Sequence, residues 1–198
     1  ILSNYNSGSL KNIYSIFKKT SFQYFCYRSS VQIISKLYSK FSIKNWAKKN
    51  NVSIFLAKSK KDLRYYEELN DINIAFNFDI IVPTNFIEKS KLGVLNIHAS
   101  NLPSDRGISP VVWAYCRGDS KICISYYLMD GGIDTGKILK KKWLKIENDW
   151  SLLRTYCEVL ELASNELVNV IEATMCNLNR ISDVKEDSKS SYNSWPDV

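Results

Sequence analysis

The chain has 198 residues, of which 45% are hydrophobic and 13% aromatic, a composition typical of a globular protein with one buried core. No apolar run approaches the roughly 18 residues that a membrane-spanning helix needs. Five cysteines without a CxxC pair, and one histidine in the whole chain, argue for reduced thiols and against a zinc site, so we expect a cytoplasmic protein that holds no metal.

The net charge of +7 is unevenly distributed along the chain. Residues 1–70 hold 13 Lys and Arg against 3 Asp and Glu, whereas residues 71–198 hold 14 against 17. A basic half is suited to an anionic partner such as nucleic acid, a nucleotide-sugar diphosphate or polyglutamylated folate. Lysine-rich helices with a solvated face would give the same count, so the charge leaves both interpretations open.

The first 70 residues are predicted to alternate between short strands and helices. A strand that ends at Ser3 is followed by a turn at 4–9, which contains Gly8, and then by a helix. Such a turn before a helix can bind phosphate through free backbone N–H groups, although an ordinary strand-to-helix turn has the same pattern. The further elements expected here are a buried strand at 22–27, one or two helices within 29–49, a strand at 52–56 and a helix at 62–69.

The remaining residues continue this alternation. The nearly continuous apolar run at 72–82 predicts a strand with a turn near Asn77. Pro110 is tolerated in the first turn of a helix, and a long apolar stripe predicts a helix at 149–178. The other expected elements are strands at 94–98, 122–129 and 137–146, and a packed loop at 191–196. This order predicts an α/β fold with an open, mostly parallel sheet and helices on both faces.

Three polar side chains are expected to meet at one edge of this sheet. Asn96 and His98 lie two residues apart in the strand at 94–98, so their side chains point to the same face. A loop follows at once, which places them near the carboxyl end of the strand, where open α/β sheets bind ligands. The strand at 122–129 ends in a loop that presents Asp134. Each residue alone also fits a turn or surface role, but together they predict an active site.

The motifs around these residues carry a family resemblance. They are Asn96-Ile97-His98, Leu102-Pro103, Arg106-Gly107, Pro110, Trp113-Ala114, Gly118, Asp130 and Asp134-Thr135-Gly136. The pattern resembles the signature of the folate-dependent formyltransferases, which include methionyl-tRNA, glycinamide ribonucleotide and sugar N-formyltransferases. The likeness covers residues 70–165 well and the first 60 poorly, and Ala99 stands where the family commonly has proline. It implies a Rossmann-like formyltransferase fold and a single catalytic domain over 1–198, truncated at one or both ends.

The resemblance also implies a reaction, formyl transfer from the co-substrate N10-formyltetrahydrofolate to an amine. Such acyl transfer needs a neutral amine, a hydrogen-bond donor for the oxygen that gains negative charge, and a group that moves protons. Carried onto this chain, Asn96 donates to that oxygen and His98 handles protons. Asp134 orients His98 or relays the proton of the amine through water. None of these roles requires a metal or a covalent nucleophile.

Binding residues are implied in the same way. In the family, the segment that matches residues 76–81 wraps the folate ring, although a plain buried strand with a kink would show the same pattern. The expected folate-binding residues are Phe76, Asn77, Phe78, Ile80, Ile81 and Asp130, and the expected substrate-binding residues are Asn6, Ser7, Gly8, Ser100 and Arg106. Arg106 would either bind an anion or hold its own loop.

The expected acceptor is a nucleotide-linked amino sugar, such as a dTDP-4-amino-4,6-dideoxyhexose, whose product would enter O-antigen or lipopolysaccharide. Residues 106–114 and 129–136 resemble the sugar and tRNA branches, and the chain has no room for the C-terminal barrel that is usual in the tRNA enzyme. A tRNA acceptor, a purine-type enzyme and a non-catalytic folate- or nucleotide-binding module remain alternatives. No membrane partner is expected, nucleic acid is not the favoured partner, and a homodimer is a candidate assembly.

Overall fold

The computed structural model describes residues 2–3, 22, 26, 29–30, 43–63, 71–78, 80–176 and 189–194. The chain divides into two compact units. The smaller comprises Ile1–Asp62, Phe78–Ile80 and Trp195–Val198, and the larger comprises Leu63–Asn77 and Ile81–Ser194. The single catalytic domain over 1–198 stays a prediction.

The smaller unit contains short strands and helices, and of the strand predicted at 52–56 only Leu56 is in a strand. Its described elements are β1 (Leu2–Ser3), β2 (Leu56–Ala57), α3 (Ile43–Lys49) and the beginning of α4 (Lys60–Leu63). β1 and β2 pair in parallel. The carboxylate of Asp62 accepts hydrogen bonds from the backbone N–H groups of Lys58 (2.7 Å) and Ser59 (2.9 Å), which fixes the start of α4.

The buried strand predicted at 22–27 is wrong at both positions that the structure describes. Phe22 and Cys26 are helical and exposed. The strand preference of aromatic residues reflects packing on a half-buried sheet surface, and neither side chain is packed in that way.

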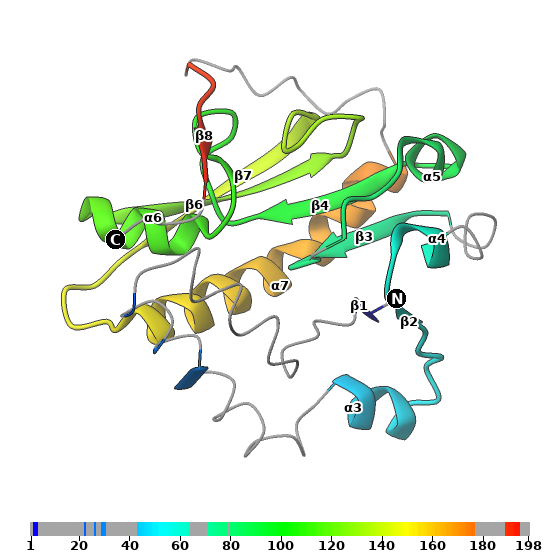
Figure 1. The fold of residues 1–198 in the computed structure, drawn as a ribbon, viewed down its shortest axis with the longest axis horizontal. Coiled ribbons are helices and arrows are strands. Elements are labelled where there is room, and N and C mark those ends of the chain that lie inside the picture. The colour runs from blue at the N-terminus through cyan, green and yellow to red at the C-terminus, as the bar shows by residue number, and fades with distance from the viewer. Residues whose placement is uncertain are drawn as a thin grey trace. The chain divides into compact units, whose positions relative to one another are not determined.

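The larger unit is built on a four-stranded sheet in the order β3-β4-β6-β7 (Figure 1). These strands are β3 (Asn73–Phe76), β4 (Val94–His98), β6 (Lys121–Leu128) and β7 (Lys137–Lys145). β3 and β4 are parallel, whereas β4–β6 and β6–β7 are antiparallel. The α/β class is confirmed, and within this described sheet one of the three pairs is parallel. β6 and β7 are antiparallel because a short loop joins them as a hairpin.

Three described helices belong to this unit, α5 (Thr84–Lys89), α6 (Pro110–Arg117) and α7 (Leu152–Cys176). α6 and α7 contact each other and both contact β6, and α7 runs across the sheet (Figure 1). Val159, Ala163 and Val170 of α7 are buried in one core with Ile124 and Tyr126 of β6. None of the helices in the described part of the chain has the length and apolarity needed to cross a membrane.

A second, two-stranded sheet joins distant parts of the sequence. β5 (Arg106–Gly107) pairs in parallel with β8 (Tyr192–Asn193), and β8 is labelled in Figure 1. Gly107 has a φ of +107°, and a Cβ there would collide with the backbone carbonyl oxygen of Asn193. Only glycine permits this close approach. The loop predicted at 191–196 therefore contains a short strand in its described part.

Candidate active site

β4 carries two of the predicted catalytic residues on one face. In the register with β6, Asn96 lies opposite Tyr127, and His98 lies opposite Ser125. Directly opposed residues of an antiparallel pair share a face, so the Tyr127 side chain reaches the same side as Asn96 and His98. The side-chain amide of Asn96 donates to the Tyr127 hydroxyl over 2.7 Å.

The loop between β6 and β7 brings Asp134 to the same place. Its turn is organised by Asp130, whose Oδ1 accepts from the backbone N–H of Gly132 (2.9 Å) and the hydroxyl of Thr135 (2.6 Å). Gly136 is needed where the loop closes, because a Cβ there would collide with the carbonyl oxygen of Leu128. Asp134 itself has a left-handed backbone, with φ +53°, a conformation that aspartate tolerates better than most residues.

The carboxylate of Asp134 is the centre of the cluster. Its Oδ1 accepts from the Tyr127 hydroxyl (2.7 Å), and its Oδ2 accepts from the backbone N–H of Gly107 (2.8 Å). Oδ2 also lies 3.6 Å from Nε2 of His98. The side chains of His98 and Asp134 are 12% and 11% exposed, so their mutual attraction is only partly screened by solvent. The structure thus brings the three predicted residues together: His98 lies directly beside Asp134, and Tyr127 connects Asn96 to Asp134.

The surroundings of His98 indicate which ring nitrogen carries hydrogen. Nε2 lies 3.3 Å from the backbone carbonyl oxygen of Asp105 and 3.6 Å from Oδ2 of Asp134. Both neighbours are acceptors, so Nε2 is assigned the hydrogen in the neutral ring. Nδ1 then holds the lone pair and can accept a proton.

Tyr127 is the member of this cluster that the sequence did not predict. Its side chain is 1% exposed, and burial together with the charge of Asp134 raises its pKa far above the usual value for tyrosine. It therefore stays a neutral phenol that accepts from Asn96 and donates to Asp134. The available signal was its position opposite Asn96 in a neighbouring strand, but that register is not visible in the sequence.

Comparison with known proteins shows the family of the chain. Residues 27–171 match the family model described as Formyl transferase, which is more than half of the chain. The chain belongs to the formyl transferase family.

Curated relatives of this chain include methionyl-tRNA formyltransferases. One from Prochlorococcus marinus subsp. pastoris is 30% identical over 143 residues, which cover 70% of this chain and 44% of that protein. One from Rickettsia felis is 31% identical over 132 residues, covering 66% of this chain and 42% of that protein. The chain thus spans less than half the length of these relatives.

Solved structures of formyltransferases share the fold. A 4-N formyltransferase from Francisella tularensis superposes with a TM-score of 0.63 at 21% identity, covering 79% of this chain and 62% of that chain. An N-formyltransferase from Helicobacter canadensis, in complex with folinic acid and dTDP-3-aminofucose, superposes with a TM-score of 0.61 at 23% identity, covering 77% and 54%. At this identity the likeness establishes the fold alone.

Two predicted substrate-binding residues lie close to the cluster. Arg106, in β5, lines a cavity of about 260 Å³ together with Asp134 and Thr135, and its Nε is buried without a hydrogen-bond partner among the described residues. Ser100 is 3% exposed, and its Oγ likewise has no partner there. A buried donor of a charged group without a partner is costly, which makes the Arg106 guanidinium a candidate ligand-binding group. Asn6, Ser7 and Gly8 lie outside the described residues.

The predicted folate-binding residues fall into different parts of the molecule. Phe76 ends β3, and Asn77 follows with a φ of +49°, which turns the chain out of the sheet as predicted. Ile81 is 59% exposed. Phe78 and Ile80 belong to the smaller unit. The carboxylate of the sixth residue, Asp130, is occupied by donors of its own loop, as described above.

Proposed function

We propose that this chain is the catalytic part of an N-formyltransferase that moves a formyl group from N10-formyltetrahydrofolate to the amine of a nucleotide-linked amino sugar. The observation that carries the proposal is the cluster of Asn96, Tyr127, Asp134 and His98, which combines an amide donor, a carboxylate and an imidazole in one partly buried place. We propose the cytoplasm as its compartment on composition alone.

The residues present fit the formyl donor. In the chain after β3, Asn77 has a left-handed backbone that turns the chain, and Ile81 has an exposed apolar side chain. A turned backbone and an apolar side chain suit the flat ring of the folate, which has a polar edge. We assign the donor to this part of the larger unit, with Phe76 as a further contact, and Phe78 and Ile80 stay predictions from the family resemblance. When bound, N10-formyltetrahydrofolate supplies the activated formyl group.

The side chains of the cluster divide the chemistry. Asn96 has two amide hydrogens, and one of them is used by Tyr127. The other is available to the formyl oxygen, where negative charge develops during attack by the amine. The Tyr127 bond fixes the amide in the orientation that presents this second hydrogen.

His98 moves protons in this scheme. The reaction needs one proton removed from the amine and one delivered to N10 of the donor, and an imidazole can do both near neutral pH. Nδ1 is the nitrogen that accepts the proton, since Nε2 already faces Asp105 and Asp134. The carboxylate of Asp134 then stabilises the imidazolium that forms.

The amino sugar is proposed from the motifs at 106–114 and 129–136. Arg106, whose buried Nε has no hydrogen-bond partner among the described residues, is assigned to an anionic group of a substrate. A product of this kind would enter surface polysaccharide. The second candidate acceptor is the aminoacyl group of methionyl-tRNA, which is favoured by the curated relatives at about 30% identity.

A turnover assay separates these acceptors. The protein is mixed with N10-formyltetrahydrofolate and, in parallel, with dTDP- and UDP-linked amino sugars and methionyl-tRNA, and release of tetrahydrofolate is followed. Formylation of one amino sugar supports the proposal. Formylation of methionyl-tRNA alone would overturn the proposal of an amino-sugar acceptor. If no acceptor is formylated while the protein still binds folate, the chain is a non-catalytic binding module. Formate release without an amine would identify a hydrolase.

A further inference from the structure

The short strand β5 has two edges, and the first of them faces the C-terminal strand β8. The backbone N–H of Arg106 donates to the carbonyl oxygen of Ser191 over 3.1 Å, and the N–H of Ile108 donates to that of Asn193 over 3.2 Å. These two donors are two residues apart, so they point to the same edge. β8 is thus bound along one side of the loop that follows β4.

The second edge of β5 faces the catalytic cluster. The N–H of Gly107 donates to Asp134, and the carbonyl of Asp105 faces Nε2 of His98. The Asp105 carbonyl and the Arg106 N–H belong to one planar trans peptide group, in which the two bonds point in opposite directions. A contact that fixes this N–H against β8 therefore also aims the carbonyl at His98.

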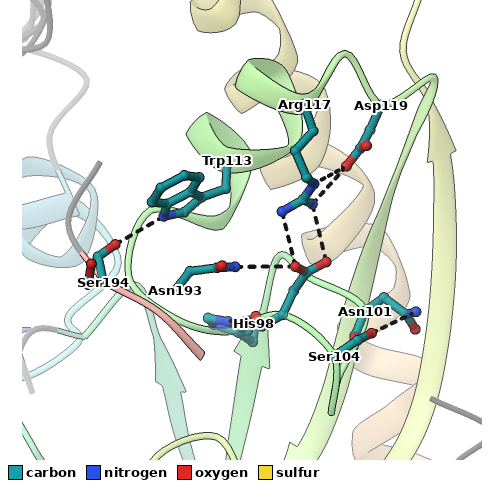
Figure 2. A network of polar contacts seen from close by, with 9 residues as sticks. His98, Asn101, Ser104, Trp113, Arg117, Asp119, Asn193 and Ser194 are labelled. Carbon is teal, nitrogen blue, oxygen red and sulfur yellow. Dashed lines mark hydrogen bonds and ion pairs between the residues drawn. The ribbon is translucent and has the colours of Figure 1, made fainter. Parts of the chain in front are cut away.

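Side-chain contacts also hold Asp105 in place, and their partners Arg117 and Asn193 are labelled in Figure 2. The carboxylate of Asp105 accepts two hydrogen bonds from Arg117, at 3.1 and 3.2 Å, and a third from the side-chain amide of Asn193 at 3.2 Å. A paired fork of this kind fixes direction as well as distance. Beside it, the indole N–H of Trp113 donates to the carbonyl oxygen of Ser194 over 3.0 Å. The carboxylate thus ties the loop to both α6 and the C-terminal segment.

We propose that residues 190–194 act as a strap that positions His98 and Asp134 through β5, and that Asp105 is the positioning residue that couples the strap to the histidine. The catalytic consequence rests on the function proposed above. The structural consequence does not, since the two acceptors that face Nε2 of His98, the Asp105 carbonyl and the Asp134 carboxylate, both contact β5 or belong to its loop whatever the protein catalyses.

The test compares two carboxylates that share one arginine. Asp119 also accepts from Arg117, over 2.7 and 3.0 Å. Among the described contacts, Asp119 reaches His98 only indirectly through this arginine, whereas Asp105 itself carries the carbonyl that faces Nε2. Asp105→Ala and Asp119→Ala each remove one carboxylate from the same guanidinium. The chain has one histidine, so the ¹⁵N spectrum of its imidazole contains one ring and reports its tautomer directly.

Asp105→Ala is expected to lower the fraction of the Nε2–H tautomer and to reduce kcat about tenfold, with both KM values within about twofold, because a misplaced catalytic group costs turnover and not binding. Asp119→Ala is expected to leave both readouts at the wild-type value. Asp105→Asn, which keeps the shape and an acceptor for Asn193, is expected to recover part of the loss. Equal tautomer fractions and equal kcat in Asp105→Ala and the wild type would overturn the proposal.

If Asp105→Ala does not fold, Asn193→Ala removes a single contact from the strap side and is expected to shift the tautomer in the same direction by less. No shift in that variant would count against the strap. If the wild-type protein formylates none of the acceptors but Asp105→Ala still shifts the tautomer of His98, the positioning role is retained and the proposed function is lost. Failure of the positioning role can therefore be distinguished from failure of the proposed function.

Discussion

Two carboxylates of the larger unit have similar exposure and opposite kinds of partner. Glu166 of α7 lies 2.6 Å from the ammonium of Lys140 and 2.9 Å from that of Lys142, both in β7, and its side chain is 16% exposed. Hydrogen bonds to these two lysines lower its pKa to about 2. Asp134 is 11% exposed, and its two closest donors, from Tyr127 and Gly107, are neutral.

The difference distinguishes the contacts of Glu166, which stabilise the fold, from those of Asp134, which suit the proposed proton transfer. Glu166 is held by ion pairs with the ammonium groups of two lysines. Asp134 is held in place by neutral donors, and the cation it can stabilise is that of His98, whose charge changes during proton transfer. A fixed carboxylate beside one titratable partner can respond to a reaction without losing its position.

The sharpest test of this contrast replaces each carboxylate with its amide. Asp134→Asn is expected to lower kcat by a factor of about 100 or more, since the charge that stabilises the His98 imidazolium is lost. Glu166→Gln, the matched control, is expected to leave kcat unchanged. The formyl-transfer assay measures both, and circular dichroism verifies the fold. Normal turnover by Asp134→Asn, or by His98→Ala, would mean that the proposed mechanism is wrong.

The next largest effect is expected from two neighbouring tyrosines of β6. Tyr127→Phe leaves the amide of Asn96 and the carboxylate of Asp134 without a shared partner, so kcat is expected to fall about tenfold and stability by about 1–3 kcal/mol. Tyr126 is equally buried, but its hydroxyl points to the other face and donates to the carbonyl oxygen of Ala163 in α7 (3.0 Å). Tyr126→Phe is expected to cost about 1 kcal/mol and no activity.

Urea unfolding gives the stabilities of both tyrosine variants, and the assay gives their kcat. An equal loss of turnover in the two variants would show that burial in β6, and not the bridge to Asp134, limits activity. An unchanged kcat in Tyr127→Phe would remove the bridging hydroxyl from the mechanism.

The same pair of tyrosines shows how far the sequence predicted the site. Local patterns predicted β4, β6 and the loop that presents Asp134, because apolar runs and turn residues are local signals. Tyr127 was missed because residues 122–127 of β6 are mostly apolar or aromatic, and Ser125 alone does not reveal that its face, which Tyr127 shares, meets Asn96. Their roles depend on the register with β4, which is a long-range property.

The pairing of β5 with β8 escaped prediction for a related reason. Each strand has two residues, too few for a periodic signal, and their partners are distant in the sequence. The strand prediction at 22–27 failed in the opposite sense, because aromatic composition was taken as evidence of burial that Phe22 does not have. The fold class could be predicted because it follows from patterns within single helices and strands. The contacts that support the site could not, because they join elements that are distant in the sequence.

A smaller effect is expected for Glu166→Gln on stability at neutral pH. The substitution removes the charge that both lysines share, so the melting temperature is expected to fall. The fall should be smaller than that of Tyr126→Phe, because the Lys140 and Lys142 side chains are 38% and 43% exposed and solvent screens the pairs. Differential scanning calorimetry at pH 7 measures the difference. A melting temperature equal to that of the wild type would mean that the pairs add nothing.

The smallest effect is the pH dependence of that difference, and its sign follows from the pKa of Glu166. The pKa is lowered in the folded protein, from 4.5 to about 2, so the stabilisation is fully present above the ordinary value and is lost as pH falls towards 2. The gap in melting temperature between wild type and Glu166→Gln should therefore be constant from pH 7 to about pH 5.5 and narrow steadily between about pH 4.5 and pH 3. If the difference in melting temperature stayed constant down to pH 3, packing of the Glu166 side chain, and not its charge, would account for the stabilisation.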